Sequence, residues 1–175
     1  RRQRQMCIRD SPKDALRLGI GMVHQHFKLI DVLSATENII LGLEGRLNIK
    51  EASRKIEEIC DKYGFEVDPK QKIYDMTVSQ KQTVEIVKVL YRGADILILD
   101  EPTRGIDVGA KYEIYQLIID LANKGKVVLM VSSEMPELLG VCDRILVMSG
   151  GKLAGEVDAK NTTQEEIMSL AAKYV

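Results

Sequence analysis

Two adjacent carboxylates, Asp100 and Glu101, directly follow the uninterrupted apolar run Ile-Leu-Ile-Leu of residues 96–99. Such a run is too short for a helix and is typical of a strand that is covered on both faces. At the carboxyl end of a parallel strand, one carboxylate can hold Mg²⁺ and the next can orient or deprotonate an attacking water. The same pair also occurs where a strand simply turns into solvent, and Pro102 suits that second interpretation.

Composition excludes several classes of protein. The chain has 175 residues, 25 basic and 26 acidic side chains, and a net charge of −1, so a broad nucleic-acid footprint is not expected. No apolar run approaches the ~20 residues that span a bilayer. The three cysteines (Cys7, Cys60 and Cys142) form no CxxC pair, and reduced thiols are therefore predicted rather than a zinc ribbon or a disulfide framework.

The elements that must position the carboxylates alternate between strand and helix, which predicts an α/β domain. We expect the strands at 21–24, 96–99, 127–131 and 144–148 to lie in one mainly parallel sheet. A Gly-Gly turn predicts that the last of these continues into a hairpin with residues 153–157. Helices are expected at 110–123, 136–139 and 163–174.

Residues 34–90 contain helix patterns only, which predicts a helical subdomain inserted into the sheet domain. Ser34 and Glu37 have the spacing of a capping box, and Gly64 ends an amphipathic pattern over residues 50–63. A further helix is expected over residues 79–91. Residues 1–10 are basic and polar without periodicity, and we interpret them as an atypical tail, a fragment end rather than a nucleic-acid or lipid-binding arm.

The block around the carboxylates, residues 95–103, resembles the Walker B motif of ATP-binding-cassette (ABC) ATPases. Gln25 stands at the position of their Q-loop glutamine, and residues 76–80 at that of their signature motif. Residues 105–107 resemble the D-loop, and residues 131–134 the switch-histidine loop. The order and spacing match from residue 11 to 175. The resemblance implies an incomplete P-loop NTPase-like cassette: a mainly parallel sheet with an inserted helical subdomain at about 34–90.

Within this family the chain is most similar to ATPase subunits of simple-sugar importers, of galactose/methylgalactoside or nucleoside-like type. Residues 11–102 resemble the first of their two tandem cassettes and residues 103–175 the second, so the chain has the pattern of a hybrid. The resemblance implies ATP and Mg²⁺ as ligands. It also implies a second cassette and transmembrane permease subunits as partners, a periplasmic or lipoprotein solute-binding protein as an indirect one, and the cytoplasmic face of the bacterial plasma membrane as location.

The resemblance also assigns roles by position. Asp100 would hold Mg²⁺, Glu101 would activate the attacking water, and Gln25 would contact the metal or that water. Ser133 occupies the position of the switch histidine. The residues that would act across the interface between two cassettes are Thr77, Ser79 and Gln80, which would cap the γ-phosphate of a nucleotide held by the opposite cassette, and Asp107.

Three departures bear on activity. No G-x-x-x-x-G-K-[S/T] loop occurs in the 175 residues, Val78-Ser79 stands where a glycine pair is usual, and Ser133 cannot supply a cationic phosphate contact. We therefore expect the isolated chain to be inactive. An alternative is a non-catalytic module that docks a membrane subunit. A third hypothesis is a P-loop enzyme of recombinase type, and the helical insertion before Asp100 argues against this hypothesis.

Overall fold

The computed structural model describes residues 11–43, 45 and 48–174, and it divides the chain into two compact units with the boundary after Val131. The first unit holds a parallel sheet and the helices around it, and the second holds a hairpin and two helices. Cys7 and the expected tail lie outside the described residues. No helix in the described ranges is both long and apolar enough to cross a bilayer.

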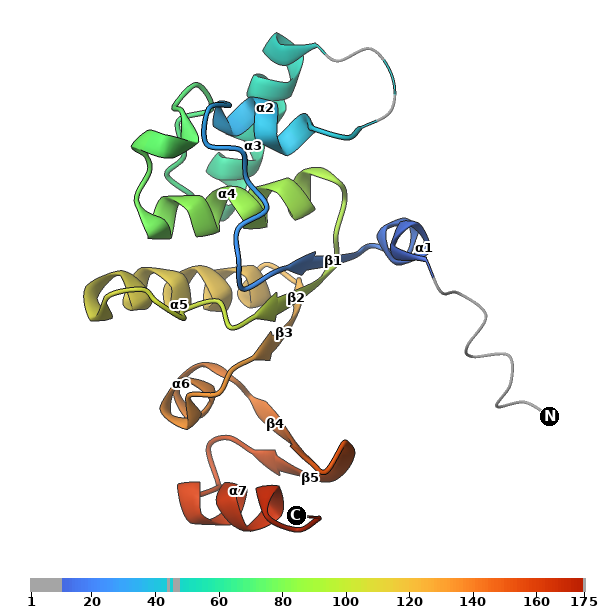
Figure 1. The fold of residues 1–175 in the computed structure, drawn as a ribbon, viewed down its shortest axis with the longest axis vertical. Coiled ribbons are helices and arrows are strands. Elements are labelled where there is room, and N and C mark those ends of the chain that lie inside the picture. Colours follow the sequence, from blue (N-terminus) through green and yellow to red (C-terminus); the bar gives the residue numbers. More distant parts are fainter. Residues whose placement is uncertain (1–10, 44, 46–47, 175) are drawn as a thin grey trace, which may run out of the picture. The chain divides into compact units, whose positions relative to one another are not determined.

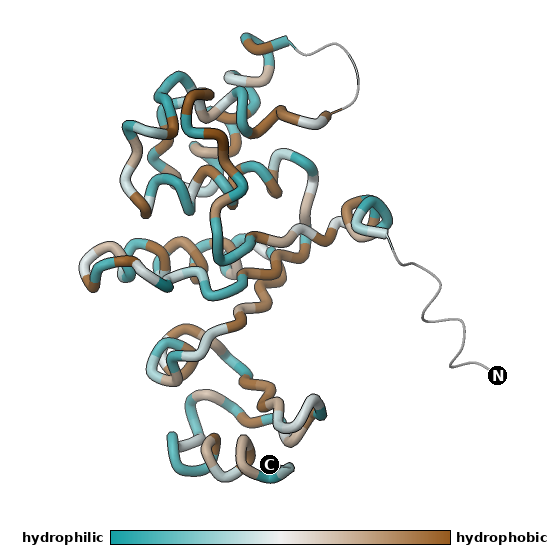
Figure 2. Tube along the Cα trace, in the orientation of Figure 1, coloured by the Kyte–Doolittle hydropathy of each residue, from teal (hydrophilic) through white to brown (hydrophobic). Residues whose placement is uncertain are grey.

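The sheet of the first unit consists of β1 (Ile20–Val23), β2 (Ile96–Asp100) and β3 (Val127–Val131), in the order β1-β2-β3 (Figure 1). Both pairings are parallel, with Val23 opposite Leu99 and Leu99 opposite Met130. The parallel arrangement predicted for these three strands is therefore confirmed. The strands are hydrophobic along most of their length (Figure 2).

Two helices pack against this sheet. α4 (Val78–Tyr91) packs on β1, and α5 (Val108–Asn123) packs on β3 and on α4. The strand residues Val23, Leu97 and Leu99 are fully buried, as are several residues of both helices. Because α4 and β2 are packed in the core, they hold in place the residues that directly follow β1 and β2.

The helical subdomain contains α2 (Ala35–Ile40), α3 (Ile49–Tyr63) and the short 3₁₀ turn η2 (Ile73–Asp75), with α2 and α3 both packed on α4. The predicted capping box is present at the start of α2. Gly64, in the left-handed region at φ 77°, ends α3 as predicted. A further helix, α1 (Pro12–Arg17), precedes β1 and is capped by the side chain of Ser11.

The second unit corrects one prediction. β4 (Arg144–Ser149) does not join the parallel sheet; it pairs antiparallel with β5 (Lys152–Asp158) in a separate two-stranded sheet. The Gly150-Gly151 turn pairs β4 with the next strand of the chain, and Ile145 and Val147 of β4 are buried in a small core with residues of α6 (Met135–Val141) and α7 (Gln164–Ala171). The predicted hairpin is confirmed.

Gly21 of β1 lies close to the end of α4. A Cβ atom at this position would lie 2.8 Å from Cβ of Val89 and 3.0 Å from Cβ of Ala94. We expect Gly21→Ala to lower the free energy of unfolding by about 1–3 kcal/mol, because overpacking displaces the strand or the helix. Urea unfolding measures this.

The matched control is Gly140→Ala in α6, where an added Cβ meets no atom within 4 Å. It is expected to stabilise the protein by about 0.5–1 kcal/mol, since alanine replaces glycine inside a helix without a clash. Equal effects of the two substitutions would contradict the close approach of β1 and α4.

Candidate functional site

The site predicted from sequence lies at the carboxyl edge of the parallel sheet. Asp100 is the last residue of β2, and Gln25 follows the end of β1 by two residues. Because β1 and β2 are parallel and in register, both residues lie at the same edge, together with Glu101. All three side chains are half-buried. The structure thus brings together the metal-binding and water-activating candidates and the Q-loop glutamine.

Glu101 has an unusual backbone. Its φ of 48° lies in the left-handed region, and among the described residues it is the only non-glycine with positive φ. Its N–H donates to the carbonyl of Val131 at the end of β3 (2.8 Å), and its carbonyl accepts from Arg104 N–H (3.2 Å). The strained turn at Glu101 is therefore held by β3 on one side and by the following loop on the other, as is common at functional sites.

The loop after β1 is anchored to α4 by two charged side chains. Lys28 N–H donates to Oε1 of Glu85 (2.6 Å), and the Lys88 ammonium donates to the carbonyl of Lys28 (2.9 Å). Glu85 and Lys88 also form an ion pair at 3.7 Å, with side chains only 7% and 14% exposed. Burial holds the pKa of Lys88 below its usual 10.5, and the Glu85 carboxylate opposes that shift.

A buried asparagine anchors the same loop further along. Asn38 of α2, which is fully buried, accepts from Ile30 N–H (2.7 Å) and donates to the carbonyls of Ile30 (3.1 Å) and Ser34 (3.0 Å). Asn38, Glu85 and Lys88 were not among the predicted site residues. Their only sequence signal is a polar residue at an otherwise apolar position of a helix, and that signal names no partner.

The residues at the start of α4 are engaged with the protein itself. Thr77 caps the helix: its hydroxyl accepts from Gln80 N–H (3.2 Å), while Oε1 of Gln80 accepts from Thr77 N–H (2.9 Å). The Ser79 side chain is buried, and its hydroxyl donates to Oε2 of Glu113 on α5 at 2.9 Å. Of the three phosphate-capping candidates, Ser79 is therefore turned toward α5.

A hollow of about 440 Å³ is lined by the loop after β1, by the start of α4 and by the loop before α5. Gln25 lines it together with Val78, the first residue of α4, and Arg104 and Gly105, which precede α5. Asp107 is exposed and caps α5, accepting from Ala110 N–H (3.3 Å). Ser133 is exposed and lies between β3 and α6, in the second unit.

The donor set at the sheet edge suits one kind of metal ion. The described residues contain no group of three or more His, Cys, Asp and Glu side chains that could hold a metal. Asp100 and Glu101 are two adjacent carboxylates at this edge, which fits Mg²⁺, because this ion keeps several waters and binds through one or two carboxylates plus substrate phosphates. A closed structural site such as that of zinc does not fit.

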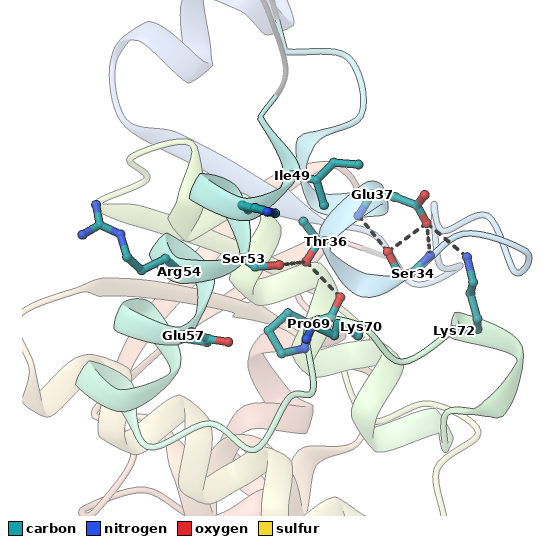
Figure 3. Close-up of a pocket in the computed structure, with 11 residues that line it drawn as sticks. Ser34, Thr36, Glu37, Ile49, Ser53, Arg54, Glu57, Pro69, Lys70 and Lys72 are labelled. Carbon is teal, nitrogen blue, oxygen red and sulfur yellow. Dashed lines mark hydrogen bonds and ion pairs between the residues drawn. The ribbon is translucent and has the colours of Figure 1, made fainter.

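A larger hollow, of about 560 Å³, lies in the helical subdomain and contains none of the predicted site residues (Figure 3). Its polar groups mainly bond one another: the Thr36 hydroxyl donates to the carbonyl of Pro69 (2.9 Å) and lies 3.0 Å from the Ser53 hydroxyl. The backbone N–H and hydroxyl of Ser34, with Lys72, lower the pKa of Glu37 to about 2. These contacts join α2, α3 and the loop before η2.

Comparisons with known proteins show the family and the fold of the chain. A sequence model of the ABC transporter family matches residues 3–104, a stretch that begins inside the expected tail and ends after Asp100 and Glu101. The solved ATP-binding cassette MJ1267 of an ABC transporter superposes with a TM-score of 0.77 at 19% identity, over 93% of this chain and 72% of that one. That likeness shows the fold.

Two curated relatives give closer sequence matches. The nucleoside import ATP-binding protein NupA of Lactococcus lactis is 44% identical over 165 residues, which are 92% of this chain and 33% of NupA. The galactose/methyl galactoside import ATP-binding protein MglA of Clostridium perfringens is 62% identical over 109 residues, 61% of this chain and 21% of MglA. The chain thus spans a third or less of the length of these relatives.

Proposed function

Because the chain belongs to the ABC transporter family, we propose that it is part of the ATP-binding subunit of an importer for a simple sugar or a nucleoside-like solute. The names of the relatives NupA and MglA, which import nucleosides and galactosides, support this solute class. The observation that carries the proposal is the meeting of Gln25, Asp100 and Glu101 at one carboxyl edge of a parallel sheet. The hybrid of two cassettes stays a prediction.

The proposed activity is the hydrolysis of MgATP. Asp100 would hold Mg²⁺, which when bound neutralises charge on the phosphates, and Gln25 would contact the metal or the attacking water. Glu101 would accept a proton from that water, since a carboxylate at this position can act as general base. The buried Glu85–Lys88 pair and Asn38 would keep the loop of Gln25 in place.

The proposed partners follow from the same family. A second cassette would meet this one at the start of α4 and at Asp107, the positions to which the family resemblance assigns contacts across the interface. Thr77 and Gln80 lie at the N-terminal end of α4. The N–H groups at a helix start are suited to a phosphate. We further propose permease subunits as partners, a solute-binding protein as an indirect one, and the cytoplasmic face of the bacterial plasma membrane as location.

A second candidate function is a non-catalytic module that docks a membrane subunit. Two observations favour it: the 175 residues contain no G-x-x-x-x-G-K-[S/T] loop, and the Ser79 hydroxyl is bonded to Glu113. Without the loop, most of the phosphate contacts are missing, and each lost donor typically costs about 10²–10³ in rate.

The test is to fuse a strand–Gly-x-x-x-x-Gly-Lys-Ser–helix segment before Ser11 and to measure phosphate release from MgATP. We expect no turnover above background and weak ATP binding from the 175-residue chain. The fusion is expected to bind and hydrolyse MgATP, and a loop Lys→Ala variant of the fusion is the control. A fusion that folds and binds ATP without hydrolysing it would favour the docking module.

A further inference from the structure

Ser79 stands at a position where the resemblance to ABC ATPases predicts glycine, and a side chain at such a position hinders the close approach of a phosphate to the backbone. In the structure, the Ser79 hydroxyl donates to Oε2 of Glu113 at 2.9 Å, and Ser79 is only 9% exposed. Glu113 is an exposed residue in the second turn of α5. A carboxylate outside the proposed catalytic set thus holds the side chain at the centre of the predicted signature motif.

The start of α4 keeps two backbone donors that this bond does not use. The capping box engages the N–H groups of Thr77 and Gln80, each of which bonds the side chain of the other residue. Val78 and Ser79 lie between them as the first two residues of the helix, so their N–H groups have no acceptor within it. The bond to Glu113 therefore removes the Ser79 hydroxyl as a phosphate ligand and leaves both N–H donors in place.

The bond to Glu113 decides where the Ser79 hydroxyl lies. A serine side chain has three staggered χ1 positions, and serine hydroxyls at helix starts readily bond nearby backbone N–H groups. A hydrogen bond to an ionised carboxylate is about twice as strong as one between neutral groups, so Glu113 selects the rotamer that faces α5. The Ser79 backbone is held as well, because its carbonyl accepts from the Thr83 hydroxyl (3.0 Å).

We propose that Glu113 is a positioning residue that acts through Ser79: it keeps this side chain against α5 and thereby keeps the N–H end of α4 open to a phosphate. The inference rests on the proposed function, in which a nucleotide held by a second cassette places its phosphate at this end. Glu113 thus allows a serine to stand where the family resemblance predicts glycine. Because Glu113 contacts neither nucleotide nor metal in this scheme, its whole effect depends on the Ser79 side chain.

The test is a double-mutant cycle in the hydrolysing fusion. Glu113→Ala is expected to lower kcat/KM for MgATP about tenfold, less than the ~10²–10³ typical of a lost donor, because the N–H groups remain and only the Ser79 hydroxyl is released toward them. Glu113→Gln is expected to retain most of the activity, since its amide oxygen still accepts from the hydroxyl. In the Ser79→Gly and Ser79→Ala backgrounds, Glu113→Ala is expected to cause no further loss, because no hydroxyl remains to be held.

The matched control is Asp120→Ala, which removes another exposed carboxylate of α5 and is expected to leave kcat/KM unchanged. A second measurement needs neither nucleotide nor the added loop: in the 175-residue chain, NMR scalar couplings to the β-protons of Ser79 report its χ1 rotamer. The unsubstituted chain and Glu113→Gln are expected to show one rotamer, and Glu113→Ala is expected to show a mixture.

Three results would each overturn the inference: one Ser79 rotamer in all three proteins, an equal loss of activity from Glu113→Ala with and without the Ser79 hydroxyl, or a Glu113→Gln fusion as impaired as Glu113→Ala. A fusion that does not hydrolyse MgATP, combined with the expected change in rotamers, would refute the proposed function and leave the orienting role of Glu113 in place.

Discussion

Glu101→Gln in the fused, hydrolysing form is expected to lower kcat for MgATP by about 10²–10⁴-fold while ATP binding is retained. The amide keeps the size of the side chain but no longer accepts a proton from the attacking water. Phosphate release under saturating MgATP measures the loss, and binding of a fluorescent ATP analogue measures what remains. Because Glu101 contributes its backbone N–H to the carbonyl of Val131 with either side chain, the fold is expected to be unchanged.

The matched control is Glu66→Gln, an exposed carboxylate between α3 and η2, which is expected to leave kcat unchanged. Glu101→Gly is a further variant, because glycine adopts positive φ without strain. It is expected to abolish hydrolysis as well, yet to raise the free energy of unfolding by up to about 1 kcal/mol, since a left-handed non-glycine residue costs about that much. A Glu101→Gln fusion with unaltered turnover would contradict the proposed role of Glu101.

Much of the first unit could be predicted because its signals are local. The run of residues 96–99 predicted a strand, Ser34 with Glu37 predicted a capped helix, and Gly64 predicted where α3 ends; the structure has all three. The strand is not covered equally on both faces, because Leu97 and Leu99 are buried and the residues that alternate with them are half-buried. α1 was missed although Ser11-Pro12 has the pattern of an N-cap followed by proline at the first helical position. That helix has only six residues and little apolar periodicity.

The place of β4 could not be predicted in the same way. Residues 145–148 are all apolar, as an interior strand of a parallel sheet would be, but Leu146 and Met148 are exposed (52% and 59%) and only Ile145 and Val147 are buried. Which strand pairs with which depends on non-local contacts, and the turn at Gly150-Gly151 favours the neighbouring strand β5. The apolar composition of β4 therefore did not specify its sheet.

For the candidate site, the types of the residues were predictable and their contacts were not. Asp100 and Gln25 could be placed at strand ends, and parallel strands bring such ends together. The bond from Ser79 to Glu113 spans 34 positions of the sequence, and that from Lys28 to Glu85 spans 57. Contacts at such separations follow from the packing of α4, and the local sequence does not predict them.

The packing of α4 leads to a second large effect, at Glu85. We expect Glu85→Ala to lower the free energy of unfolding by about 3–5 kcal/mol, because it leaves the largely buried ammonium of Lys88 without its anionic partner and the N–H of Lys28 without its acceptor. Urea unfolding followed by circular dichroism measures the change. Hydrogen exchange is expected to quicken at the amide of Lys28, which loses its hydrogen bond.

The control for Glu85 is Glu58→Ala in α3. Glu58 also pairs with a cation on its own helix, Arg54 at 3.8 Å, but the two side chains are 63% and 75% exposed. An exposed pair contributes about 0–1 kcal/mol, so the control is expected to change stability by no more than that. Glu85 is thus buried and accepts a hydrogen bond from a backbone N–H, whereas Glu58 is exposed.

The double variant Glu85→Gln/Lys88→Met separates the buried charge from the anchoring of the loop. It removes both charges at nearly constant volume, and the introduced amide oxygen can still accept from Lys28 N–H, so the variant is expected to be more stable than Glu85→Ala. In the hydrolysing fusion, its kcat is expected to fall, because Lys88 no longer holds the carbonyl of Lys28 and the loop that carries Gln25 gains freedom. A double variant as unstable as Glu85→Ala would mean that the helix packing, and not the unpaired ammonium, accounts for the loss.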